Sequence, residues 1–162
     1  MAAGRAFAEV GLDWVAADEA PSIAELERYR AAGTAWVVVP DDASAAGSPA
    51  GYVVVEVLDG ALAGPAGGAL HVEQVSVDPA FARRRLGRRL IEHVVDEAQA
   101  RGLRSVTLTT FRDVPWNAPY YERCGFAVVP AAELGPALVR VRADEAARGL
   151  DAAPRVAMRR AV

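Results

Sequence analysis

The stretch VSVDPAFARRRLGR, residues 75–88, carries the strongest structural signal in the chain. It opens with β-branched residues typical of a strand, passes through Asp78-Pro79, which favours a turn, and then enters a helix near Leu86. The helical pattern runs over residues 86–101, where apolar side chains recur on one face at positions 90, 91, 94, 95 and 98. Gly102 is a typical helix terminator.

A strand on each side of this helix completes a larger unit. Residues 71–77 and 104–110 are both strand-like, so residues 71–110 read as strand, helix and strand. Two strands joined by a crossover helix normally lie parallel in one sheet. The sequence therefore predicts a parallel pair at the centre of the fold.

The remaining segments add helices and strands around the same sheet. Ser22 and Glu25 form a capping-box pattern at the start of a helix over residues 21–32. The other expected helices cover residues 2–10, 118–123 and 139–148, and the other expected strands cover residues 35–39, 51–58, 126–129 and 155–159. A hairpin-like loop joins the strands at 35–39 and 51–58. We expect an α/β fold of the mixed α+β type, forming a single domain over residues 1–162.

Composition narrows the functional class. With 162 residues, 52% hydrophobic, and a net charge of −3, the chain fits a globular domain and neither a disordered segment nor a nucleic-acid coat. No apolar stretch approaches the ~20 residues of a membrane-spanning helix, and residues 1–10 lack the apolar region of a secretory signal. The single cysteine and two histidines show no metal-ligand spacing. We therefore expect a cytoplasmic protein with no metal, no nucleic-acid partner and no membrane contact.

The turn into the central helix is a candidate anion site. The first NH groups of a helix have no partner within the helix, and the helix dipole leaves about half a positive charge there. Gly87 permits close approach of a ligand, and five arginines add positive charge: Arg83, Arg84, Arg85, Arg88 and Arg89. The sequence alone leaves two interpretations open, a polyphosphate site or a solvated basic helix start. A phosphate loop with a lysine is excluded, because all 18 basic residues are arginine.

Two separated segments resemble the signatures of the GNAT superfamily of N-acetyltransferases. The first is residues 75–88, where the family has a strand, then V-x-P, then a loop with Gln or Arg and two small residues that opens a helix. The second is residues 117–126, NAPYYERCGF, where the family has an Asn-led helix, a tyrosine and a Gly-Phe end. The two lie in the family order. The likeness covers residues 35–129 well and both ends weakly.

The resemblance implies a fold and a cofactor. It implies a mixed sheet whose parallel strands splay apart, with helices on both faces, and acetyl-CoA lying in the gap. The pantetheine arm would follow Val75, Ser76 and Val77, and the diphosphate would meet the turn formed by Arg83, Arg84, Arg85, Leu86, Gly87 and Arg88. Asn117 is carried over as a further cofactor contact, although it stands closer to the tyrosine than in the family.

The first signature departs from the family pattern at two positions. Ala82 stands where the family has Gln or Arg, and Arg85 stands where it has the first glycine. If position 85 requires a positive φ, arginine is strained there by about 1 kcal/mol or more. Backbone NH groups would still bind a diphosphate, so we expect the location of the cofactor to persist even if its affinity changes.

Amide formation from a thioester needs a neutral amine, a stabilised oxyanion and a proton for the leaving thiolate. Tyr121, at the family's tyrosine, is the expected acid; otherwise it packs its helix. Glu73, on the same strand face as Val75, is the expected base, or else a surface carboxylate. Holding a lysine-like amine neutral at pH 7 costs about 4 to 5 kcal/mol. There are three ways to meet this cost: burial raises the pKa of Glu73 and makes it a stronger base, the substrate amine has a lower pKa, or the amine loses its proton before it binds. The backbone NH of Val75 would meet the oxyanion.

The acceptor and the oligomeric state remain open at this stage. The acidic segment 13–19 suits a cationic amine on a small molecule or peptide, or is a solvated loop. Family members usually begin with a strand, whereas a helix is expected here, so either that strand is absent or another element covers the edge, such as the partner subunit of a homodimer. The function implied is acetyl transfer from acetyl-CoA to a primary amine; the alternative is a non-catalytic acyl-CoA-binding regulatory module.

His71, Cys124 and His93 complete the candidates. His71 either assists Glu73 or has a structural role. Cys124 is expected in the core, because no neighbouring base suggests thiolate chemistry, and His93 is expected on the solvated face of its helix.

Overall fold

The structure is a computed structural model that describes residues 7, 11–12, 21–41, 47–58 and 67–162. Apart from Phe7, the expected helix over residues 2–10 and the whole acidic segment 13–19 lie outside the described residues. The expectations about the first helix, the missing edge strand and the acidic loop therefore stay predictions.

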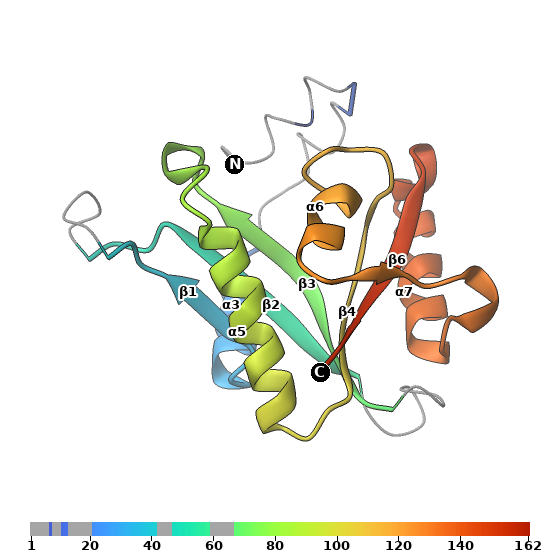
Figure 1. Cartoon of the computed structure of the whole chain (residues 1–162), viewed down its shortest axis with the longest axis horizontal. Coiled ribbons are helices and arrows are strands. Elements are labelled where there is room, and N and C mark those ends of the chain that lie inside the picture. The colour runs from blue at the N-terminus through green and yellow to red at the C-terminus, as the bar shows by residue number, and fades with distance from the viewer. Residues whose placement is uncertain (1–6, 8–10, 13–20, 42–46, 59–66) are drawn as a thin grey trace. The chain divides into compact units, whose positions relative to one another are not determined.

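The strands form a six-stranded sheet in the order β1-β2-β3-β4-β6-β5 (Figure 1). Their bounds are β1 Ala35–Val38, β2 Gly51–Leu58, β3 Ala69–Val77, β4 Ser105–Phe111, β5 Ala127–Val128 and β6 Arg155–Ala161. β1 pairs antiparallel with β2, β6 pairs antiparallel with both β4 and β5, and β3 pairs parallel with β4. The predicted mixed α/β fold and its parallel central pair are confirmed.

The helices agree with the sequence pattern in the middle of the chain and differ toward its end. Their bounds are α3 Ile23–Ala31, α5 Leu86–Ala100, α6 Ala118–Arg123 and α7 Pro136–Ala147. The capping box of α3 is present, because the Ser22 NH donates to Glu25 Oε2 at 2.8 Å and the Glu25 NH donates to Ser22 Oγ at 3.2 Å. α7 begins three residues before the predicted start, since Pro136 stands in its first turn, where a missing NH has no cost.

The chain divides into two compact units, each with its own buried side chains. The first unit is Met1–Val55 with Glu73–Glu92, and the second is Glu56–Val72 with His93–Val162. Val53, Val55 and Ile91 are fully buried in the first unit, and Leu70, Val106, Leu108 and Met158 are fully buried in the second. The expectation of a single domain over residues 1–162 stays a prediction.

In the second unit, α6 and α7 belong to opposite faces of β4 and β6. Glu145 of α7 accepts from Thr109 of β4 and from Arg155 of β6, the latter at 2.7 Å. Asn117, at the start of α6, donates to Thr110 of β4 at 2.7 Å, and the carbonyl at the end of α6 accepts from Arg160 of β6 at 2.8 Å. Neighbouring strand residues such as 109 and 110 point to opposite faces, so helices cover both sides of this part of the sheet.

Within the described residues, no helix has the length and apolar character needed to span a bilayer. Over the same residues, no three His, Cys, Asp or Glu side chains are grouped in a way that could hold a metal ion.

Candidate functional site

The two halves of strand β3 differ in burial and in their register with β4. Residues 69–72 are buried, and they carry the parallel register with β4, from Ala69 opposite Ser105 to Val72 opposite Leu108. Residues 73–77 continue the strand beyond this register, and none of them is buried. Apolar residues such as Val75 and Val77 are normally buried in a central strand. This half of β3 thus offers a strand edge suited to an extended ligand.

Close packing on the other side of β3 fixes this half of the strand. A Cβ added to Gly51 of β2 would lie 2.7 Å from the carbonyl oxygen of Ser76 and 3.1 Å from a methyl of Val77. The Asp78 NH donates to the Ala50 carbonyl at 2.8 Å. Only glycine allows β2 to approach so closely, which holds residues 76–78 in place.

A structured turn follows β3 and leads into α5. A 3-10 helix, η3 Pro79–Phe81, was not predicted; Asp78 caps it by accepting from the Ala80 NH at 2.9 Å. Arg83 and Arg85 then adopt left-handed backbone conformations, with φ of 63° and 59°. The condition considered for position 85 is therefore met, and Arg83 is a second strained position that the sequence did not indicate.

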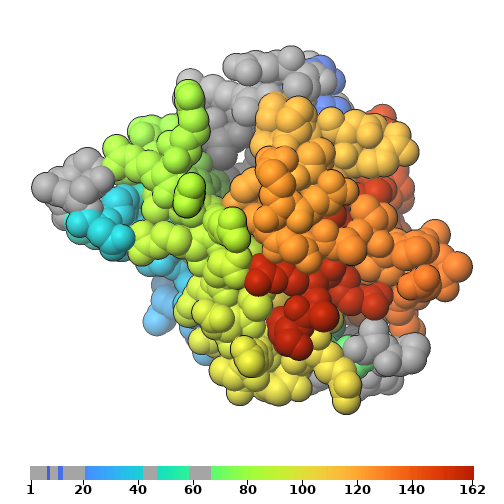
Figure 2. Space-filling model, viewed as in Figure 1, coloured from blue at the N-terminus to red at the C-terminus, as the bar shows by residue number. Residues whose placement is uncertain are grey.

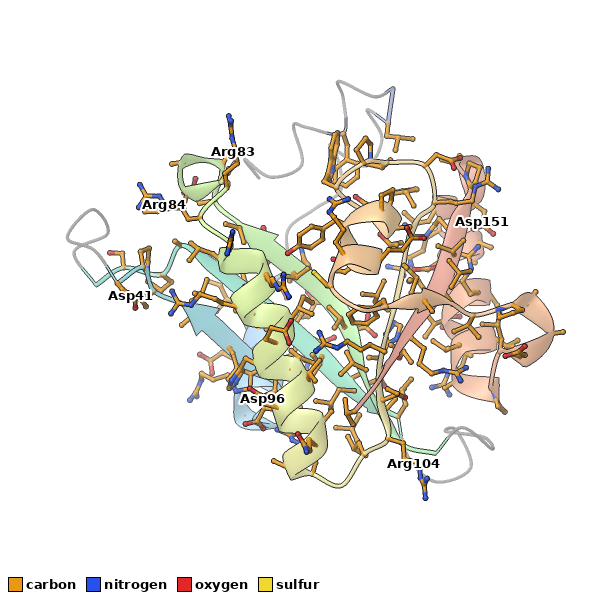
Figure 3. All side chains as sticks on the ribbon, viewed as in Figure 1. Asp41, Arg83, Arg84, Asp96, Arg104 and Asp151 are labelled. Carbon is orange, nitrogen blue, oxygen red and sulfur yellow. The ribbon has the colours of Figure 1, made fainter. Side chains whose placement is uncertain are left out.

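The five arginines of the turn differ in their partners. The Arg84 guanidinium lies 5.1 Å from the centre of the Phe81 ring, Arg88 forms an ion pair with Glu92 at 3.5 Å, and Arg89 reaches Asp41 at 3.0 Å. All five are exposed, and the segment lies on the surface of the molecule (green in Figure 2). Figure 3 shows the side chains of Arg83 and Arg84 directed away from the turn.

The candidate base, Glu73, is exposed. It follows the last paired residue of β3, and the alternation of the strand puts it on the same face as His71 and Val75. Because Glu73 is exposed, burial does not strengthen it as a base in this structure. Two of the three expected routes to a neutral amine are left: a substrate amine with a lower pKa, or deprotonation of the amine before it binds.

His71 has the structural surroundings of a core residue. It is 1% exposed, and its Nδ1 lies 2.9 Å from Thr107 Oγ1 on β4. Burial lowers its pKa to about 4, although the nearby Glu145 carboxylate acts in the opposite direction. His71 is therefore neutral at pH 7.

The candidate acid, Tyr121, lies on α6 in the second unit. Its ring makes edge-on contacts with Tyr120 at 5.3 Å and with Phe126 at 5.8 Å between centroids, and the residue keeps partial exposure. Burial raises the pKa of Tyr121 above its usual value, with a smaller contribution from Cys124. The phenol is therefore protonated throughout the neutral range, as an acid must be.

Asn117 occupies the position before α6, as its motif indicates, but its side chain does not cap the helix. Its amide instead donates to Thr110 and fixes the start of α6 against β4. Cys124 is buried and His93 is exposed, as predicted.

The structure groups the predicted residues by unit. Glu73, Val75, Ser76, Val77 and the whole turn from Arg83 to Arg88 lie in the first unit, on β3 and the segment that follows it. Tyr121 and Asn117 lie in the second unit. Two features of these residues were not predicted: the backbone strain at Arg83 and the hydrogen bond from Asn117 to Thr110. The identity of the residues alone does not indicate either feature.

Comparison with known proteins assigns the class. The family model described as the acetyltransferase (GNAT) family matches residues 6–126, which is most of the chain. The chain therefore belongs to this family.

A curated relative adds detail. The ribosomal protein bS18-alanine N-acetyltransferase of Salmonella typhimurium (strain LT2) is 40% identical over 52 residues, which is 32% of this chain and 35% of that protein. The alignment thus spans about a third of the curated relative.

Solved structures support the fold. The NatC complex bound to Gag peptide and CoA matches with a TM-score of 0.65 and 12% identity, over 90% of this chain and 82% of that one. The N-acetylglutamate synthase of Neisseria gonorrhoeae, complexed with coenzyme A and N-acetyl-glutamate, matches with a TM-score of 0.65 and 18% identity, over 99% of this chain and 31% of that one.

Proposed function

We propose that this chain transfers the acetyl group of acetyl-CoA to a primary amine of a small molecule or peptide. The observation that carries the proposal is the change within β3, where a strand leaves its parallel partner and continues into a basic turn and a long helix. Membership of the acetyltransferase (GNAT) family and the coenzyme A held by fold relatives support this reading.

The donor would lie along β3 and the turn. Backbone groups of Val75, Ser76 and Val77 would bind the amide-rich pantetheine arm, as an added strand does. The NH groups at the start of α5, from Arg83 to Arg88, would bind the diphosphate, helped by the helix dipole. Asn117 would contribute by holding the start of α6, through its bond to Thr110. The bound cofactor supplies the activated acetyl group.

The chain's own residues would then move the protons. The amine nitrogen attacks the thioester carbon while Glu73 accepts an amine proton, directly or through water. The Val75 NH stabilises the oxyanion. When the carbon–sulfur bond breaks, Tyr121 donates its proton to the sulfur. Burial raises the pKa of Tyr121 above the usual thiol value near 8.5, so complete proton transfer to the thiolate is uphill. The phenol therefore assists chiefly by donating a hydrogen bond to the negative charge that develops on sulfur as the carbon–sulfur bond breaks.

The test uses Tyr121→Phe with Tyr120→Phe as its matched control on the same helix. Phenylalanine keeps both ring contacts of Tyr121, so the fold and donor affinity should be unchanged. Loss of a general acid should lower kcat by roughly 100- to 10,000-fold, whereas Tyr120→Phe should stay within a few-fold of the parent. Release of free thiol is measured with a panel of amines, including polyamines, aminoglycosides and peptide N-termini.

Two results would argue against the proposal. A Tyr121→Phe variant as active as the parent would remove the assigned acid. Tight binding of acetyl-CoA without turnover on any amine would favour the non-catalytic acyl-CoA-binding module.

A further inference from the structure

Helix α6 is too short to fix its own position. It has six residues, and an isolated helix shorter than about 12 residues is only marginally stable in water. Contacts at the two ends of α6 therefore decide where Tyr121, its fourth residue, lies.

Both ends of α6 are held by the same pair of strands. At the start, the Asn117 amide donates to Thr110 on β4 at 2.7 Å. At the end, Arg160 Nη1 on β6 donates to the Cys124 carbonyl at 2.8 Å. Arg160 lies opposite Val106 in the β4–β6 register, four residues or about 13 Å along β4 from Thr110. The helix with its two flanking residues spans about 10 Å, so the two hydrogen bonds match its length.

The turn at the end of α6 is bonded directly to Tyr121. The NH groups of Cys124 and Phe126 both donate to the Tyr121 carbonyl, at 2.9 and 3.0 Å. Gly125 lies between them with a φ of 85°, a left-handed conformation that commonly ends a helix. The Phe126 ring also packs edge-on against the Tyr121 ring. A displacement of this turn would therefore displace Tyr121.

Arg160 is the side chain on β6 that holds this turn. A Cβ added to Gly125 would lie 3.4 Å from both Cδ and Nε of Arg160, so the arginine side chain runs alongside the turn. The last carbonyls of a helix have no partner within the helix, and a positive charge beside them is favourable. Arg160 thus satisfies the Cys124 carbonyl and fixes the turn with one side chain.

We infer that Arg160 is a positioning residue: by holding the turn at the end of α6, it places the Tyr121 hydroxyl beside the leaving sulfur. This inference rests on the proposed function, in which Tyr121 is the acid. A hydrogen bond to the charge that develops on sulfur depends steeply on distance and angle, so a small shift of α6 would weaken it.

The experiment compares Arg160→Met with Arg159→Met. Both arginines are half-buried on β6, but strand alternation directs Arg159 to the face opposite α6, so the control removes the same charge from the same strand. Arg160→Met should lower kcat by about tenfold to a hundredfold, whereas Arg159→Met should stay within a few-fold of the parent. Rates are expressed per active site, from the stoichiometry of acetyl-CoA binding in calorimetry, and KM for acetyl-CoA should change little.

A double-mutant cycle separates positioning from a general effect on the fold. If Arg160 acts through Tyr121, adding Arg160→Met to Tyr121→Phe should lower kcat by less than about threefold, because the phenol is already absent. Arg160→Lys keeps the charge and a donor on a shorter side chain, so its kcat should lie between those of the parent and Arg160→Met. It should have no further effect in Tyr121→Phe, and it serves the same test if Arg160→Met is too unstable to assay.

The outcomes distinguish this inference from the proposed function. Equal kcat for Arg160→Met and Arg159→Met, with Tyr121→Phe impaired, overturns the inference and leaves the proposed function standing. Equal fold losses from Arg160→Met in the parent and in Tyr121→Phe also overturn it, because the effect then does not pass through the phenol. A fully active Tyr121→Phe, or binding of acetyl-CoA without turnover on any amine, overturns the proposed role of Tyr121 and this inference with it.

Discussion

His71 gives the fold a dependence on pH that can be measured apart from activity. The imidazole is buried on β3 beside Thr107, and burial lowers its pKa from 6.5 to about 4. In the unfolded chain it takes up a proton near pH 6.5, whereas in the folded chain it resists protonation until about pH 4. Between these values the unfolded state binds more protons, so stability falls as pH falls.

The size of the effect follows from the two pKa values. A difference of about 2.5 units at about 1.36 kcal/mol per unit gives roughly 3 kcal/mol of stability, fully present above pH 6.5 and lost by about pH 4. Glu145, a charged group near His71, acts in the same direction at the acidic end of this window, because a carboxyl with a lowered pKa also loses its stabilising contribution as pH falls. Burial raises its pKa, but hydrogen bonds from Arg155 and Thr109 outweigh burial, and the net pKa is lowered.

The assay is urea unfolding at several pH values from 4 to 7, for the parent, His71→Asn and His93→Asn. Asparagine keeps a polar atom near the Nδ1 position, so Thr107 retains a partner while the titrating ring is lost. The His71 variant should lose most of the slope with pH. His93, the other histidine, is exposed, so its variant should keep the slope of the parent. A parent and a His71 variant with equal slopes would refute the reasoning.

Two further predictions concern packing. Glu145→Ala leaves the largely buried Arg155 without its carboxylate and leaves Arg142 with Asp151 alone. The change should cost about 3 to 5 kcal/mol and lower the thermal midpoint by roughly 10 °C, whereas Asp151→Ala, at the exposed end of the same cluster, should cost under about 1 kcal/mol. Scanning calorimetry measures both variants, and similar midpoints for the two would contradict the assigned network. Gly51→Ala places a Cβ 2.7 Å from the Ser76 carbonyl oxygen, which should lower the free energy of unfolding by about 1 to 3 kcal/mol. Displacement of β3 should also weaken the binding of acetyl-CoA. Chemical unfolding measures the first effect and calorimetry the second, and no change in either would show that β2 does not position this strand.

The features that sequence reasoning captured are those with local causes. The change from a period of two in residues 71–77 to helical spacing in residues 86–101 predicted β3 and α5, and the Ser22–Glu25 pattern predicted the capping box. The start of α7 was missed, because the predicted helix began at residue 139, whereas the helix begins at Pro136, and proline suits the first turn of a helix.

The features that it missed depend on distant parts of the chain. Glu145 is buried with its carboxylate bound by Arg155 and Arg142. No local sequence pattern predicts the pair of Glu145 on α7 and Arg155 on β6, which are ten residues apart. Arg83 and Arg84 are the same residue type, yet only Arg83 has a positive φ, so residue type could not predict its backbone conformation. Residue roles carried over from the family, such as those of Glu73 and Tyr121, stay predictions for the kinetic tests.

Amide hydrogen exchange with and without coenzyme A tests most directly whether the exposed half of β3 and the turn after it receive the donor. Saturating coenzyme A should slow exchange in peptides covering residues 73–77 and 83–89, while a peptide covering α7, residues 136–147, serves as the internal reference and should change little. Slowed exchange confined to other segments, or none in the β3 and turn peptides at saturation, would contradict the account.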